Sequence, residues 1–174
     1  MYKRILIAAA SALLLAGPAA AQPRHYGFEE IATDLAYGFC PLFLAGQFRL
    51  DSPQLAERGF AKEVGRQAHP RFGELQMVGA KLPEGEIAFG GAPGKICSVV
   101  AGGDKRQAVL TKLRTSMSWT GLDFKPVPNT GAKVPGVIVE TFRAPVEAQA
   151  LYVQLVQTSG ATPSVMVQMF AMAQ

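Results

Sequence analysis

The chain has 174 residues, of which 17 are basic, 13 are acidic and 49% are hydrophobic. The net charge of +4 is small and the basic residues are scattered, so the sequence lacks the electrostatic footprint of a nucleic-acid-binding protein. The length is that of one domain and is sufficient to bury a core.

The first 21 residues have the three parts of a cleavable secretory signal peptide. Lys3 and Arg4 form a short positive start, residues 5–16 are apolar, and small residues at 19–21 precede Gln22. Because the apolar run is too short to span a bilayer, we expect no stable membrane anchor. We therefore predict that residues 1–21 are removed, which lowers the net charge from +4 to +2, and that residues 22–174 form a single periplasmic or secreted domain.

Two segments after the signal peptide have the apolar spacing of helices, at steps of three and four. The first covers residues 28–47, and Pro41 predicts a kink or break within it. The second covers residues 52–69, with Ser52 as its N-cap and Pro53 at its first helical position.

The remainder of the chain is predicted to form strands and one helix. The helix follows a Gly-Gly turn and is expected at residues 105–119. The strands are expected at residues 74–81, 85–90, 95–101, 134–143, 150–158 and 164–172. The sequence thus predicts an α+β fold, in which two N-terminal helices and one crossover helix pack on an antiparallel sheet of about five or six strands.

Two cysteines follow the signal peptide, Cys40 and Cys97. An even cysteine count in an exported chain indicates a disulfide, and this one would staple the first helix to the sheet. Neither cysteine belongs to a CxxC motif and both have apolar neighbours, an environment that makes a thiol inert. We therefore favour a structural bridge over a pair of reactive thiols.

A few residues carry a resemblance to a known group of proteins. The helix with Phe39-Cys40-Pro41, and the strand with Ile96-Cys97-Ser98-Val99 followed by Gly102-Gly103-Asp104 and a helix, resemble small uncharacterised secreted or periplasmic proteins of Gram-negative bacteria. The resemblance implies an envelope location and the disulfide, and it implies no activity.

The residues that most often carry chemistry are isolated in this sequence. His25 and His69 have no HExxH or paired Cys/His spacing beside them, which argues against a zinc site. Ser116 and Ser118 lack the GxSxG and SxxK patterns of serine nucleophiles and are expected at a solvated helix end.

Two further motifs are weaker still. The glycine-rich residues 90–94 lack the GK[ST] of a phosphate loop and are predicted to be a turn. Glu84 and Glu86 lie two residues apart around a turn, which is not the separation that glycoside hydrolysis needs. We therefore assign no catalytic, cofactor-binding or metal-binding residue and expect no cofactor.

Two surfaces are candidates for interactions. Arg58, Lys62, Arg66 and Arg71 would form a basic stripe on the second helix, interpreted as a solvated face with an anionic partner as the alternative.

The last predicted strand is the second candidate, because it is rich in flexible Met side chains. Met166, Met169, Phe170 and Met172 are a possible interaction edge, although core filling is the simpler interpretation and a Cu(I) site a more remote one.

The sequence is most consistent with an exported, non-enzymatic binding or accessory domain that acts on a protein or another envelope component. Unpaired strand edges with adaptable side chains suit strand addition. The alternative is a small cell-envelope hydrolase whose site is not recognisable from the sequence.

We predict that protein purified from the periplasm begins at Gln22 and resists alkylation until it is reduced, because the signal peptide is cleaved and both thiols are bridged. Mass spectrometry of an alkylated, denatured sample tests both points. Retained residues 1–21, or two alkylated thiols without reductant, would contradict the prediction.

Overall fold

The computed structural model describes residues 26–129, 131 and 133–173, so the predicted signal peptide and His25 lie outside the described residues. The helical elements are α1 (Phe28–Asp34), the π-helical turn η1 (Leu35–Phe39), α2 (Cys40–Leu44), α3 (Pro53–Ala56), α4 (Arg106–Thr115) and the 3-10 turn η2 (Met117–Thr120). The strands are β1 (Gly65–His69), β2 (Gly73–Leu82), β3 (Gly85–Ala92), β4 (Ile96–Gly102), β5 (Lys125–Val127), β6 (Val137–Val146), β7 (Gln149–Thr158) and β8 (Ser164–Ala173).

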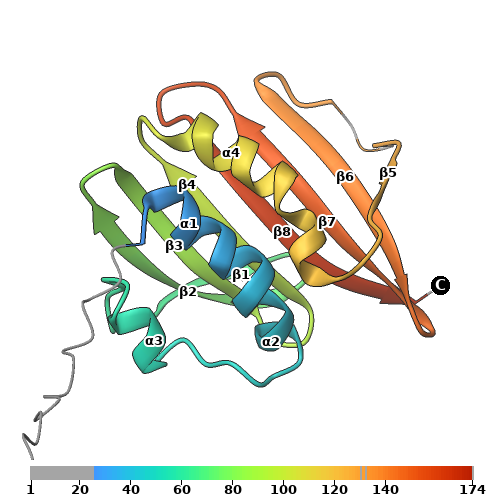
Figure 1. The fold of residues 1–174 in the computed structure, drawn as a ribbon, viewed down its shortest axis with the longest axis horizontal. Coiled ribbons are helices and arrows are strands. Elements are labelled where there is room, and N and C mark those ends of the chain that lie inside the picture. Colours follow the sequence, from blue (N-terminus) through green and yellow to red (C-terminus); the bar gives the residue numbers. More distant parts are fainter. Residues whose placement is uncertain (1–25, 130, 132, 174) are drawn as a thin grey trace, which may run out of the picture.

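These eight strands form one antiparallel sheet in the order β1-β2-β3-β4-β8-β7-β6-β5. After β4 the chain crosses the sheet through α4, and β8 then returns to pair with β4 in the middle of the sheet. Helices α1, α2 and α4 all lie on one face (Figure 1). Among the described residues, the fold therefore has a helical layer on one side of the sheet and no helix on the other.

The predicted fold class is wrong in two respects, because the sheet has eight strands rather than five or six and the N-terminal part has one long helix rather than two. The first predicted helix is present as the continuous run α1, η1 and α2, and the predicted crossover helix is α4. The second predicted helix is reduced to the four residues of α3, whose Ser52 cap does accept a hydrogen bond from the Gln54 N–H.

Backbone geometry explains why the second helix stops. Gly59 has φ +84°, a conformation that ends a helix and that few other residues adopt. Leu55 before it and Phe60 after it are both buried, so the core holds the chain on each side of the bend. Residues of β1 then pair with β2 from Gly65 opposite Met77 to His69 opposite Gly73.

The two strands that the sequence did not indicate carry little apolar signal. Four of the five residues of β1 are exposed, so no alternation of buried and exposed side chains marks it. Strand β5 has only three residues and contains Pro126.

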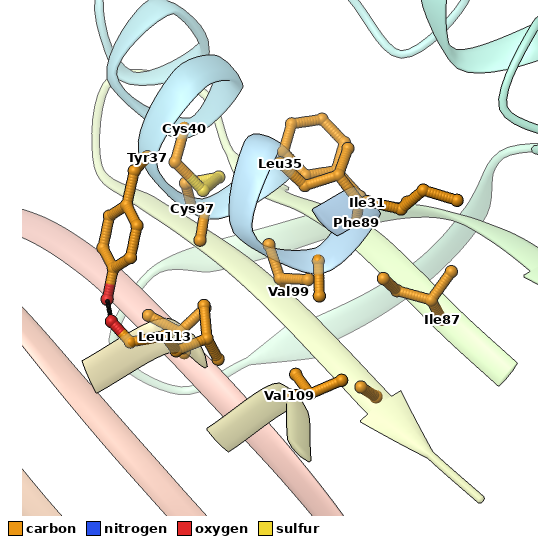
Figure 2. Close-up of a cluster of buried hydrophobic side chains, with 14 of the residues drawn as sticks. Ile31, Leu35, Tyr37, Cys40, Ile87, Phe89, Cys97, Val99, Val109 and Leu113 are labelled. Carbon is orange, nitrogen blue, oxygen red and sulfur yellow. Dashed lines mark hydrogen bonds between the residues drawn. A yellow bond between two sulfur atoms is a disulfide. The ribbon is translucent and has the colours of Figure 1, made fainter. Parts of the chain in front are cut away.

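The main core lies between the helical layer and the covered face of the sheet. Figure 2 shows Ile31 and Leu35 of the N-terminal helix among Phe89 and Val99 of the sheet, with Val109 and Leu113 of α4 beside them. Each of these six side chains is buried. Since burying one such side chain contributes about 1.5–3 kcal/mol, this interface makes a large contribution to the stability of the fold.

The N-terminal helix is attached to its neighbours by two specific links (Figure 2). The predicted disulfide is confirmed: Cys40 is bonded to Cys97 of β4, 57 residues away. The Tyr37 hydroxyl donates a 2.8 Å hydrogen bond to the Leu113 carbonyl oxygen, which lies in the last turn of α4. Carbonyl groups in the last turn of a helix lack partners within their own helix, and the Tyr37 hydroxyl provides a hydrogen-bond donor for one of them.

Of the predicted kink or break at Pro41, the break does not occur, because α2 continues through it. Proline removes one backbone donor and disfavours a regular α-helix around it. The chain instead widens into η1, where the Cys40 N–H donates to the Leu35 carbonyl oxygen five residues earlier. The helix therefore continues through Pro41, which keeps Cys40 facing β4.

Removing the bridge with Cys40→Ala/Cys97→Ala should lower the free energy of unfolding by about 4 kcal/mol, because the unfolded chain gains the freedom of a long loop. Urea denaturation of the variant beside the wild type measures this. A loss below about 1 kcal/mol would show that the bridge does not stabilise the fold in this way.

Because the Tyr37 side chain is buried, we expect the fold to lose stability at alkaline pH. Burial raises the pKa of Tyr37 well above its usual value, so the folded state holds the neutral phenol while the unfolded chain ionises above pH about 10. Stability from this group is complete below that pH and falls as the pH rises.

The variant Tyr37→Phe should cost about 1–3 kcal/mol at neutral pH, because the Leu113 carbonyl loses its partner. It should also show a shallower decline above pH about 10. Urea unfolding from neutral to alkaline pH tests both points, and equal slopes for variant and wild type would contradict the assignment.

Candidate functional site

The uncovered face of the sheet carries three parallel rows of side chains, which cross the strands from pairing partner to pairing partner. The apolar row consists of Ala88, Val100, Met166, Val156 and Val139. The polar row consists of Ser98, Gln168, Gln154 and Thr141. The arginine–aromatic row consists of Arg143, Tyr152 and Phe170, and Arg71 of the β1–β2 turn reaches its end.

The sheet bends so that this face is concave at one end. The Phe72 ring of the β1–β2 turn lies 6.3 Å from the Phe170 ring of β8, although β3 and β4 separate β2 from β8 in the sheet. Three strand spacings in a flat sheet would amount to about 14 Å. The β1–β2 turn therefore curls across the ends of β3 and β4.

Gly90 of β3 allows the backbones of β2 and β3 to lie close together at this end of the sheet. Its φ is +148°, and a Cβ atom there would overlap the carbonyl oxygen of Gln76 on β2. Only glycine allows the two backbones to come this close.

A hollow of about 840 Å³ lies beside the apolar row at the other end of this face. Its wall includes the turn between β7 and β8, and its residues include Gly79, Ala88, Val100, Gly102, Pro163 and Ser164. The floor is low because the strand residues there are glycine, alanine and valine. Its volume is within the range of small-molecule sites.

Three of the four charged side chains at the rim of the hollow, Lys81, Glu86 and Arg106, are paired or bonded locally. Lys81 lies 3.3 Å from Glu86, and both side chains are exposed. The Arg106 guanidinium donates to the Gly103 carbonyl oxygen at 3.0 Å. The hollow therefore presents a small apolar floor inside a polar rim of both charge signs.

The arginine–aromatic row combines stacking with unused hydrogen-bonding capacity. The Tyr152 and Phe170 rings stack at 5.5 Å, and the Arg71 guanidinium lies 5.8 Å from the Phe170 ring. Arg143 Nε is buried and has no hydrogen-bond partner among the described residues. A buried donor without an acceptor is rare in folded proteins and calls for an explanation.

The polar row also keeps free hydrogen-bonding groups. Gln154 donates from its amide to the Thr141 hydroxyl at 3.2 Å, which leaves its amide oxygen and the hydroxyl proton available. Gln168 and Ser98 stand in register beside Gln154, one on each following strand. Ser98 and Thr141 are buried, whereas Gln154 and Gln168 are half-buried, so the row presents mainly the amide groups of the two glutamines.

The predicted interaction edge is not an edge of the sheet. Strand β8, which carries Met166, Met169, Phe170 and Met172, lies between β4 and β7. Met169 is buried in the main core, and Phe170 is buried in a second, smaller cluster with Ala92 and Ile96. Strand addition along β8 is therefore ruled out where it pairs on both sides, and Met166 and Met172 point away from Met169 because alternate residues face opposite sides.

The predicted basic stripe does not lie on one helix. Arg58 is nearly buried, pairs with Asp34 at 2.6 Å and lies over the Tyr26 and Phe39 rings. Arg66 is on β1 and pairs with Glu74 at 2.7 Å.

The other two members of the stripe lie in two different segments. Lys62 is in the loop before β1 and Arg71 is in the β1–β2 turn. These four residues therefore form no common anion-binding site.

The described histidine is engaged in a turn. His69 Nδ1 accepts hydrogen bonds from the backbone N–H groups of Arg71 and Phe72, at 3.1 and 3.3 Å. It thereby fixes the turn that brings Phe72 toward Phe170.

The other sequence candidates are also dispersed. Ser116 is buried at the end of α4, while Ser118 lies in η2. Gly90 and Gly91 belong to β3, so the predicted turn begins only after Ala92. Glu86 pairs with Lys81 and Glu84 lies in the β2–β3 turn.

Within the described residues, no three His, Cys, Asp or Glu side chains are placed to share a metal ion. None of the helices described here is both long and apolar enough to cross a membrane.

The sequence analysis missed Arg143, Tyr152 and the polar row. Their strands were predicted, but strand order and register decide which side chains meet, and neither can be read from one strand at a time. The available signal was the alternation in β7, where Gln154 sits between apolar neighbours.

Comparisons with protein-family models, with curated proteins and with solved structures find no match for this chain.

Proposed function

We propose that this protein is an exported, non-enzymatic binding domain that holds its ligand on the uncovered face of the sheet. The observation that carries the proposal is the hollow of about 840 Å³ beside the apolar row. Binding sites for small molecules are concave, largely apolar and equipped with a few polar groups that set orientation. The apolar and polar rows provide these two elements side by side.

Export is part of this proposal. The Cys40–Cys97 bridge is compatible with an oxidising compartment, where disulfides form and persist. The pattern of residues 1–21 supports the same location.

The binding proposal replaces the strand-edge version of the earlier hypothesis. Because β8 lies inside the sheet, its side chains rather than its backbone are available on this face. The hydrolase alternative gains no support from His69, whose Nδ1 is occupied by the β1–β2 turn.

Filling the hollow tests the proposal. The variant Ala88→Leu places a larger side chain on its floor, and Ala171→Leu makes the same change at an exposed position of the same sheet outside the hollow. We expect an extract of bacterial envelope glycans, peptides and lipids to leave a bound mass on the wild type and on Ala171→Leu but not on Ala88→Leu.

Native mass spectrometry detects the bound mass, and the thermal midpoint should rise with it. A ligand at about 100 times its Kd stabilises the folded state by about 2.7 kcal/mol. The proposal fails if the wild type retains nothing, or if the Ala88→Leu variant, folded by circular dichroism, binds as the wild type does.

A further inference from the structure

This inference rests on the proposal that the uncovered face binds a ligand, and it names the class of ligand for the Arg143 end of that face, outside the lining of the hollow. We propose that the uncovered face binds an acidic oligosaccharide, with a carboxylate held by Arg143 and successive sugar units on Gln154 and Gln168 of the polar row.

Arg143 supplies the anion-binding group. Its Nε is buried without an acceptor among the described residues, and it takes part in none of the ion pairs found in that part of the chain. A guanidinium presents a planar fork of donors that matches the two oxygens of a carboxylate. A bound carboxylate would pair with the terminal nitrogens of this guanidinium, because Nε is buried and out of a ligand's reach.

The charge around Arg143 also favours an anion. Lys125 is the pairing partner of Arg143 on β5. Lys125 forms an ion pair with Asp123 at 2.9 Å, so the charges of Lys125 and Asp123 cancel. Arg71 stands at the far end of the same row, over the Phe72 and Phe170 rings. The row therefore carries two arginines whose charge no described carboxylate neutralises.

The spacing of the polar row fits a chain of sugars. Its four side chains stand on adjacent strands, about 4.8 Å apart, which is close to the length of one pyranose unit in an extended glycan. Gln168 and Gln154, the half-buried members of the row, would each offer an amide to one sugar, and the buried Ser98 and Thr141 lie at the two ends of the row. Hydroxyl and amide groups both donate and accept, as sugar hydroxyls require.

The aromatic rings supply the remaining contact. Tyr152 lies between Arg143 and Phe170 in register and stacks on Phe170. The C–H face of a sugar ring is apolar and packs on an aromatic side chain, and the Tyr152 hydroxyl provides a polar tip beside it.

The polar row also decides against an acyl chain as the ligand. A fatty acid bound by Arg143 would have to cross Gln154 and Gln168 to reach the hollow. Its chain would remove water from both amides without replacing the hydrogen bonds, which is unfavourable. A glycan crossing the same row would replace them.

Isothermal titration calorimetry with three probes tests the proposal: a β-1,4-linked hexauronate, neutral cellohexaose and palmitate. We expect the hexauronate to bind more tightly than cellohexaose, and palmitate not to bind. The variant Arg143→Gln should weaken hexauronate binding by about tenfold or more. Arg66→Gln, which removes the same charge on β1, should leave the affinity unchanged.

Two further variants keep the test decisive. Arg143→Lys retains the charge without the fork and should bind with intermediate affinity. Gln168→Leu leaves Arg143 in place and should weaken the hexauronate and cellohexaose alike. Circular dichroism and the unfolding midpoint verify that each variant is folded.

Three results would overturn the proposal: no hexauronate binding, equal losses for Arg143→Gln and Arg66→Gln, or binding of palmitate in place of the hexauronate. The palmitate result would leave the proposed function intact, because the face would still bind a ligand. The proposed function fails separately, if filling the hollow has no effect on any bound envelope component.

Discussion

The Cys40–Cys97 disulfide ties the N-terminal helix to β4, one of the two central strands of the sheet. Because side chains alternate along a strand, Cys97 and Val99 face the helices, whereas Ser98 and Val100 face the other way. The bridge therefore fixes which face is covered. Tyr37 adds a second link, to the end of α4, so the two main helices are held beside each other over the same side. All that we propose about binding depends on this one-sided arrangement.

The same strands form both faces of the sheet, but the side chains on the two faces have different roles. On the covered face, Phe89, Val99 and Val167 are buried against the helices and stabilise the fold. On the uncovered face, the apolar, polar and arginine–aromatic rows leave hydrogen-bonding groups without partners, most clearly at Arg143. Such groups weaken a fold unless a ligand or water meets them. Curling of the β1–β2 turn toward Phe170 makes that face concave, so a ligand would be enclosed rather than laid on a flat surface.

Local patterns predicted the elements of this fold better than its architecture. The crossover helix and six of the strands followed from spacing and alternation, because each depends on neighbouring residues, and the disulfide followed from the count of two cysteines in a chain expected to be exported. The prediction of a long second helix was wrong, since the apolar spacing of Leu55 and Phe60 fits both a helix and the bend at Gly59. The Met-rich strand was taken for an edge because strand order, which places β8 between β4 and β7, is a long-range property. The candidate site depends on that order and on register, so only the Met166 and Phe170 positions were found in advance.

Methionine side chains offer a direct test of which face binds. Met77 and Met166 lie on the uncovered face, whereas Met169 and Met117 belong to the covered core. The measurement is methyl NMR of protein labelled at methionine, titrated with bacterial envelope extract. Binding on the uncovered face predicts that the Met166 and Met77 signals shift while those of Met169 and Met117 stay in place. Shifts confined to Met117 and Met169, or no shift at all, would contradict the assignment of this face as the binding site.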